Sequence, residues 1–161
     1  MAELALRSYI DEHGRVPFEA WILDLDRQAQ AKVTIALSRL QRGNLSNAEY
    51  ENVMPLTRSF KEFVKSRIER DPKFRQALFQ EAVQMLIEGD VDTAKSVLRD
   101  YINATIGFPA LAEATRMPPK SLMRMFGPKG NPTAVNLFSV IVALQDKTGV
   151  HLEVRAVAVA A

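Results

Sequence analysis

Residues 107–145 read GFPALAEATRMPPKSLMRMFGPKGNPTAVNLFSVIVALQ and contain two short helical patterns followed by a longer one. The first short pattern covers residues 108–115 and the second covers residues 119–126. A tight break, Arg-Met-Pro at 116–118, separates them. Two short helices joined in this way are typical of a helix-turn-helix, which places its second helix in the major groove of DNA. The sequence therefore predicts a helix-turn-helix over residues 108–126.

The second short segment has an apolar side and a polar side. Leu122 and Phe126 lie four residues apart, so they share the inward face of a helix. Pro119 suits the first helical position, where the missing N–H would have no partner inside the helix. The outward face then carries polar side chains, namely Lys120, Ser121 and Arg124.

The net charge of the chain is only +2, which is too small to indicate a polyanionic partner. The distribution of the charge along the chain is more informative. Residues 1–53 carry a net charge of −2, whereas residues 54–161 carry +4. Positions 114–145 contain no acidic residue but four basic ones, which are Arg116, Lys120, Arg124 and Lys129. Spaced cations commonly form only a solvated face. On the outer side of this motif we interpret them as contacts to DNA phosphates and bases.

Each outward residue has a predicted role on double-stranded DNA. Lys120, Ser121 and Arg124 would enter the major groove, where an arginine reads guanine through two bonds to O6 and N7. Lys129 and the backbone amides beside it would meet phosphate and fix the register. A single module of this size is small for sequence-specific binding. We therefore expect a homodimer on a palindromic operator with half-sites about 34 Å apart. The predicted DNA-binding set is Arg116, Pro119, Lys120, Ser121, Arg124, Lys129 and Asn131.

These residues resemble the helix-turn-helix of the Xre/Cro superfamily, and in particular the HigA-like antidote (antitoxin) proteins of HigBA-type toxin–antitoxin modules. The resemblance rests on LAEAT (111–115), on PKSLMRMFGPKGNPT (119–133) and on the helix that follows from Pro132. It implies a transcriptional repressor that regulates its own operon. These motifs usually place glycine where Arg116 stands, and arginine is strained at positive φ. Either the turn is of another type, or the geometry of the second helix is altered.

The amino-terminal part has a different pattern. Residues 4–11 alternate weakly, as a strand does, and residues 17–25 and 27–42 predict an αα-hairpin capped by Asp26 with Trp21 as its core anchor. Residues 6–46 resemble the start of a HigB/RelE-type toxin, in which later strands carry the RNA-cleaving residues. Those strands do not follow here, so no ribonuclease activity is expected of this segment.

The middle of the chain predicts three helices before the helix-turn-helix. The first spans 57–70 and opens on Ser59 and Glu62, the spacing of a capping box. Asp71 caps the second helix, which opens on proline and runs to residue 88. Asp90 caps the third, which ends at Gly107.

The carboxy-terminal part predicts one more helix and a strand. Asn131 is the expected cap of the last helix, Phe138 belongs to its expected buried stripe, and Gly149 ends it. Residues 150–155 alternate like a strand, which could pair with residues 4–11 or with its own copy across a twofold axis.

The predicted fold is therefore mainly α: a multi-helix domain with a helix-turn-helix, an N-terminal strand and αα-hairpin, and a short C-terminal strand. Its expected organisation is a toxin-like fragment over 1–46, a linker over 47–56 and an antidote-like helical domain over 57–161.

Several classes of protein are not expected. The chain has no cysteine, and His13 and His151 lie far apart without clustered carboxylates, so no metal site and no cofactor is predicted. No acid–base set or nucleophile constellation indicates an enzyme. No membrane span or signal peptide is apparent, and a cytoplasmic location is expected. The alternative function is a protein-interaction module that binds and neutralises a HigB/RelE-type toxin, with DNA binding weak or lost.

Overall fold

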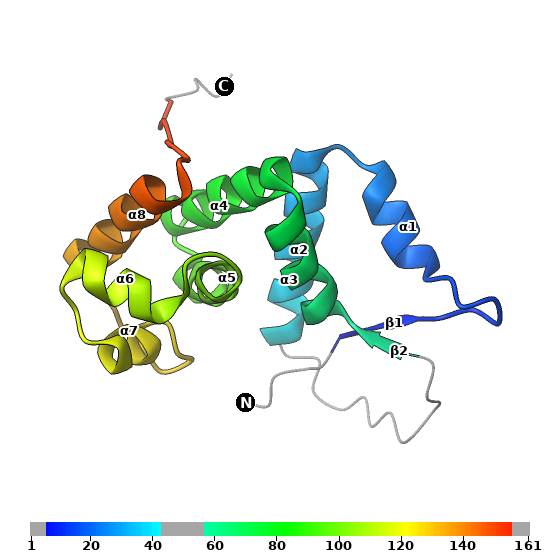
Figure 1. Ribbon diagram of the computed structural model, residues 1–161, viewed down its shortest axis with the longest axis horizontal. Helices are drawn as coiled ribbons and strands as arrows, with labels where there is room; N and C mark the ends of the chain where they lie inside the picture. Colours follow the sequence, from blue (N-terminus) through cyan, green and yellow to red (C-terminus); the bar gives the residue numbers. More distant parts are fainter. Residues whose placement is uncertain (1–5, 43–56, 156–161) are drawn as a thin grey trace.

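The computed structural model describes residues 6–42 and 57–155, and their regular structure is mainly helical. Figure 1 shows α6, α7 and α8 at one end, the two strands and α1 at the other, and α4 and α5 between them. The elements in chain order are β1 (Arg7–Tyr9), α1 (Pro17–Asp24), α2 (Arg27–Arg42), β2 (Thr57–Ser59), α3 (Phe60–Arg70), α4 (Pro72–Ile87), α5 (Val91–Ala104), α6 (Gly107–Thr115), α7 (Pro119–Met125) and α8 (Ala134–Thr148). The predicted linker at 47–56 and the end of the chain after residue 155 lie outside the described residues.

The amino-terminal strand forms, but it does not pair with residues 150–155. β1 pairs with β2 in an antiparallel two-stranded sheet, with Arg7 opposite Ser59 and Tyr9 opposite Thr57. The predicted carboxy-terminal strand is wrong for its described part, because residues 150–155 have no strand structure. There the backbone N–H of Leu152 donates to the Gln145 side chain at 2.7 Å, so it is taken by the preceding helix rather than by a neighbouring strand.

The two predicted amino-terminal helices are confirmed as α1 and α2. Asp26 caps α2, with its carboxylate accepting from the backbone N–H groups of Gln28 and Ala29 at 2.9 and 3.0 Å. The prediction that Trp21 anchors the core is wrong, because 51% of its surface is exposed. α1 is only eight residues long and turns Ile22 inward, so Trp21 lies at the rim against the ring of Phe18.

The caps of the central helices are mostly as predicted. Asp71 accepts from the backbone N–H groups of Lys73 and Phe74, and Asp90 accepts from that of Thr93. The predicted capping box at Ser59 is wrong, because the Ser59 side chain makes no cap bond. Ser59 belongs to β2, so its backbone follows the sheet instead.

A single apolar cluster runs through the helices on both sides of the predicted linker. α2 packs against α4 and α5, and α3 packs against the same two helices. Ile22 and Ile35 from the amino-terminal part are 1–2% exposed and belong to the same cluster as Leu78 of α4. Residues 6–42 therefore share their core with the helices after the linker.

Hydrogen bonds and ion pairs also join α2 to α3 and α4. Arg67 of α3 donates through Nη2 to Gln30 of α2 at 2.9 Å and to Asp71 at 2.7 Å. Arg27 of α2 pairs with the same carboxylate of Asp71 at 2.7 Å. Asp71 thus receives two guanidinium groups, one from each side of the predicted linker.

The last helix forms, but two details of it differ from the prediction. Thr133 rather than Asn131 is the N-cap, and its hydroxyl accepts from the backbone N–H of Asn136 at 3.3 Å. Phe138 is not buried, since 64% of its surface is exposed. Gly149 ends the helix in the left-handed region, as predicted. In the described part of the chain, none of the helices combines the length and the apolar character that crossing a bilayer requires.

Candidate nucleic-acid interface

Helices α6 and α7 occupy the two segments in which short helices were predicted, to within one residue. Leu111 of α6 and Leu122 of α7 are fully buried. The ring centroids of Phe108 and Phe126 lie 6.5 Å apart. α6 also packs against α5 and α8, so this helix pair (residues 107–125) is seated on the core through α6.

The turn between the two helices keeps the geometry that glycine normally provides. Arg116 has φ 56° and ψ 26°, which is the left-handed region, and it is the only described residue other than glycine with positive φ. Of the two alternatives from the sequence, the turn is therefore not of another type at this residue. A non-glycine side chain in this conformation costs about 1–2 kcal/mol.

The predicted DNA-contacting residues all lie at the surface. The four cations, Arg116, Lys120, Arg124 and Lys129, are exposed, and none of them forms an ion pair within the described residues. Pro119, Ser121 and Asn131 are exposed as well. Lys120 and Arg124 lie one helical turn apart on α7, while Arg116 precedes that helix and Lys129 follows it. The structure thus gathers these cations around one short helix.

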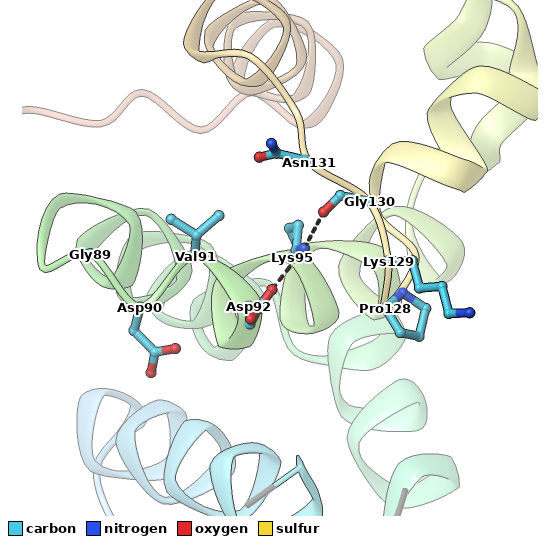
Figure 2. Close-up of a pocket in the computed structure, with 9 residues that line it drawn as sticks. All are labelled: Gly89, Asp90, Val91, Asp92, Lys95, Pro128, Lys129, Gly130 and Asn131. Carbon is cyan, nitrogen blue, oxygen red and sulfur yellow. Dashed lines mark hydrogen bonds and ion pairs between the residues drawn. The ribbon is translucent and has the colours of Figure 1, made fainter. Parts of the chain in front are cut away.

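The segment after α7 is held by a cation that the sequence analysis did not single out. Lys95 of α5 is buried, and its Nζ donates to the backbone oxygen of Gly130 at 2.5 Å and pairs with Asp92 at 2.8 Å (Figure 2). One turn further along α5, Arg99 donates to the backbone oxygen of Met123 at 3.3 Å. Lys95 and Arg99 therefore fix the end of α7 and the loop that carries Lys129.

Gly130 explains why this loop lies so close to α7. A Cβ atom built on Gly130 would stand 2.1 Å from the backbone oxygen of Met125, which is far inside van der Waals contact. Only glycine permits this approach, and the approach brings the Gly130 oxygen to Lys95. Lys129 is consequently displayed from a loop with a defined backbone path.

An open hollow of about 370 Å³ lies between this loop and the start of α5. Figure 2 shows its lining residues, with Asp90 and Asp92 from α5 and its cap on one side and Lys129 to Asn131 on the other. The acidic groups are engaged by the protein: Asp92 by Lys95, and Asp90 by Arg39 at 2.7 Å. Burial opposes the ionisation of Asp90, but the bonds from Arg39 and Thr93 outweigh it and lower the pKa of this carboxyl.

Neither the hollow nor the helix pair has the groups of a metal centre. Within residues 6–42 and 57–155, no three histidine, aspartate or glutamate side chains converge on a point that a metal ion could occupy. What the surface around α7 offers is exposed positive charge, a hydroxyl and an amide, which are donors suited to phosphate oxygens and base edges.

The sequence carries a signal that Lys95 is buried, which the sequence analysis missed. Lys95 lies between Ala94 and Leu98, which are both buried on the inward side of α5. A lysine on the apolar stripe of a helix must find an acceptor inside the protein, because leaving an ammonium group buried without one is costly. Its acceptor, the Gly130 oxygen, is 35 residues away and was not predictable from local spacing.

No protein-family model matches the sequence, and the comparisons with curated proteins and with solved structures gave no match either.

Proposed function

We propose that the protein is a sequence-specific DNA-binding transcriptional regulator, in which the helix pair α6–α7 acts as a helix-turn-helix. One observation carries the proposal: exposed cations without ion-pair partners in the described structure surround α7, in a stretch that has no acidic residue from 114 to 145. Exposed surface charge is ordinarily interspersed in sign, and a run of one sign on a convex helix suits the phosphate backbone.

The arrangement supports a division of roles among these residues. Arg124 and Lys120 share the outward side of α7 and would face the base edges in the major groove, with Ser121 beside them. Lys129 and Asn131, on the loop held by Lys95, would contact phosphate. Arg116 and Pro119 flank the start of α7 and would lie at the edge of the same contact. By the family resemblance, the target would be the promoter of its own operon, bound as a homodimer.

The experiment is a fluorescence-anisotropy titration of the full chain with labelled DNA from its own upstream region and with a scrambled duplex. We expect tighter binding to the upstream DNA than to the scrambled duplex. We also expect the affinity to fall steeply between about 50 and 200 mM salt, because binding of the protein releases cations that are condensed on the DNA. Arg124→Ala should cost about 1–3 kcal/mol of binding free energy and relax one base position. Arg70→Ala, which removes an exposed arginine from α3, is the matched control and should leave binding unchanged.

An unchanged affinity and base preference in Arg124→Ala would contradict the assignment of α7 as the recognition helix. Loss of affinity in Arg70→Ala to the same extent would mean that net charge alone drives binding, without a defined interface.

A second function, the binding of a HigB/RelE-type toxin, is favoured by a different observation. The amino-terminal helices α1 and α2 resemble the start of such a toxin, and α2 packs on α4 and α5 through both apolar contacts and ion pairs. We infer that this packing reproduces in one chain the way in which a toxin would dock on the antidote-like helices. A toxin should then co-purify poorly with the full chain. It should co-purify better with Ile35→Asp, because a charge in place of this buried side chain would release α2 from the apolar cluster that holds it.

A further inference from the structure

Helix α7 exposes an apolar side chain beside its cations. Met123 is 42% exposed, whereas Leu122 and Met125 of the same helix are buried. The inward side of α7 is thus formed by other residues, and Met123 lies outside it. The backbone oxygen of Met123 accepts from Arg99 of α5 at 3.3 Å. Met123 is therefore a surface residue on a stretch of backbone that the protein holds in place.

The exposed side of α7 consists of two adjacent rows. Pro119 and Met123 lie four residues apart and form an apolar row, and Lys120 and Arg124 form a cationic row in the same way. Each residue of the apolar row directly precedes one of the cationic row, so the two rows run side by side along the helix. A single exposed apolar side chain is ordinary on a protein surface. What distinguishes Met123 is its place beside the residues that would read bases.

The major groove of DNA offers a chemical partner for each row. The 5-methyl group of thymine is the apolar group that identifies a base there, and the other identifying groups are hydrogen-bond donors and acceptors. The cationic row suits acceptors such as guanine O6 and N7. A thioether is at most a weak acceptor, and its flexible, polarisable chain packs well on apolar groups. The apolar row therefore complements thymine as the cationic row complements guanine.

We propose that Met123 is a specificity-determining residue, which recognises a thymine through its 5-methyl group. The inference rests on the proposed function and deepens it, because it names a second base of the operator. Consecutive Cα atoms lie about 3.8 Å apart, and stacked base pairs lie about 3.4 Å apart. The thymine should therefore lie within about two base pairs of the guanine that Arg124 would read.

The DNA side of this contact can be tested by removing the methyl group alone. The full chain is titrated with the upstream duplex and with duplexes in which single thymines are replaced by deoxyuridine, which pairs in the same way. At one thymine near the Arg124-dependent guanine of each half-site, the replacement should weaken binding about threefold to tenfold, as the loss of a buried methyl group would. Replacement of thymines outside the site should have no effect.

The protein side is tested with the same two duplexes. Met123→Ala should bind the thymine and uracil duplexes with equal affinity, and so should Met123→Gln, which keeps the length of the side chain but not its apolar character. The second variant keeps the test valid if the first fails to fold. Met123→Leu, which is apolar and similar in volume, should still prefer thymine. Ile87→Ala, which truncates an exposed apolar side chain of α4, is the matched control and should also keep the preference.

The failure of this inference differs from the failure of the proposed function. Equal affinity of the unchanged protein for thymine and uracil at every position would overturn the role of Met123. A preference that survives in both Met123→Ala and Met123→Gln would overturn it too, because another group would then contact the methyl. Either result leaves the DNA-binding function standing if Arg124→Ala still weakens binding and relaxes its base position. Equal binding of the upstream and scrambled duplexes contradicts that function itself, and the role of Met123 falls with it.

Discussion

Arg116 combines an exposed cation with a backbone conformation that suits glycine. Its φ of 56° places it in the left-handed region at the end of α6, where helices commonly finish on glycine. The residue therefore lowers the stability of the turn while adding a positive charge next to α7. Glycine in its place would relieve the strain but would remove that charge.

Replacing Arg116 by glycine should stabilise the fold and replacing it by alanine should not. Arg116→Gly relieves the strain of the left-handed conformation. Its free energy of unfolding is therefore expected to be about 1 kcal/mol higher than that of Arg116→Ala. Both variants lose the same charge, so urea unfolding of the pair isolates the backbone effect. Equal stability of the two variants would mean that Arg116 does not hold this conformation in solution.

At the scale of single elements, the junction of α2, α3 and α4 depends on one carboxylate. Asp71 caps α4 and also receives Arg27 and Arg67 at 2.7 Å each. Burial opposes the ionisation of Asp71, but the N–H of Phe74 and the two guanidinium groups outweigh it, so its pKa lies below the ordinary 3.8. The junction is thus held together by a charge that acid removes.

The sign of the pH dependence follows from that lowered pKa. The stabilisation from Asp71 is fully present above pH 3.8 and is lost as the pH falls from there through the folded-state pKa. Asp71→Asn keeps a capping oxygen but loses the charge, so it should destabilise the protein by about 1–3 kcal/mol at pH 7. Its stability should also fall less between pH 5 and pH 3 than that of the unchanged protein. Asp24→Asn, at an exposed position on α1, is the control for urea unfolding across this range.

Sequence reasoning succeeded for elements that are determined by neighbouring residues. Asp26, Asp71 and Asp90 cap the helices that follow them because each carboxylate reaches backbone N–H groups two or three residues ahead. The limits of α6 and α7 were likewise predictable, because proline at 119 and the apolar spacing lie within the segments themselves.

Features that depend on distant contacts were predicted less well. β1 pairs with a strand that begins 50 residues later, and no local pattern favoured Thr57–Ser59 over the alternating residues at 150–155. Phe138 fits an apolar stripe by spacing, but the inward side of α8 is set by its packing on α6. At the candidate site the exposed residues were predicted, whereas Lys95 was missed because its acceptor belongs to a loop far along the chain.

At the scale of the whole molecule, the described parts on either side of residues 43–56 form one core. Ile22 and Ile35 are buried with the helices that follow β2, and Arg39 reaches Asp90 at the start of α5. The toxin-like and antidote-like resemblances therefore apply to segments that are packed together. We expect them to depend on each other for stability.

Cutting the chain between these parts should leave them associated. With a protease site inserted among residues 47–53, the cleaved protein should elute as one species in gel filtration at physiological salt. The buried apolar contacts, which salt does not screen, account for this. Uncleaved protein of the same sequence is the control. Separation into two soluble fragments would show instead that residues 57–161 form an independent domain.

The rim position of Trp21 has a practical consequence. It is the only tryptophan of the chain, and it lies half exposed on α1. Figure 1 shows α1 at the end of the molecule opposite α7. Its emission, excited at wavelengths where tyrosine does not absorb, therefore reports the detachment of the amino-terminal helices and is silent about events at α7. Far-UV circular dichroism averages over all helices. A difference between the midpoints of thermal unfolding given by fluorescence and by circular dichroism would show that the two ends of the protein do not unfold in one cooperative step.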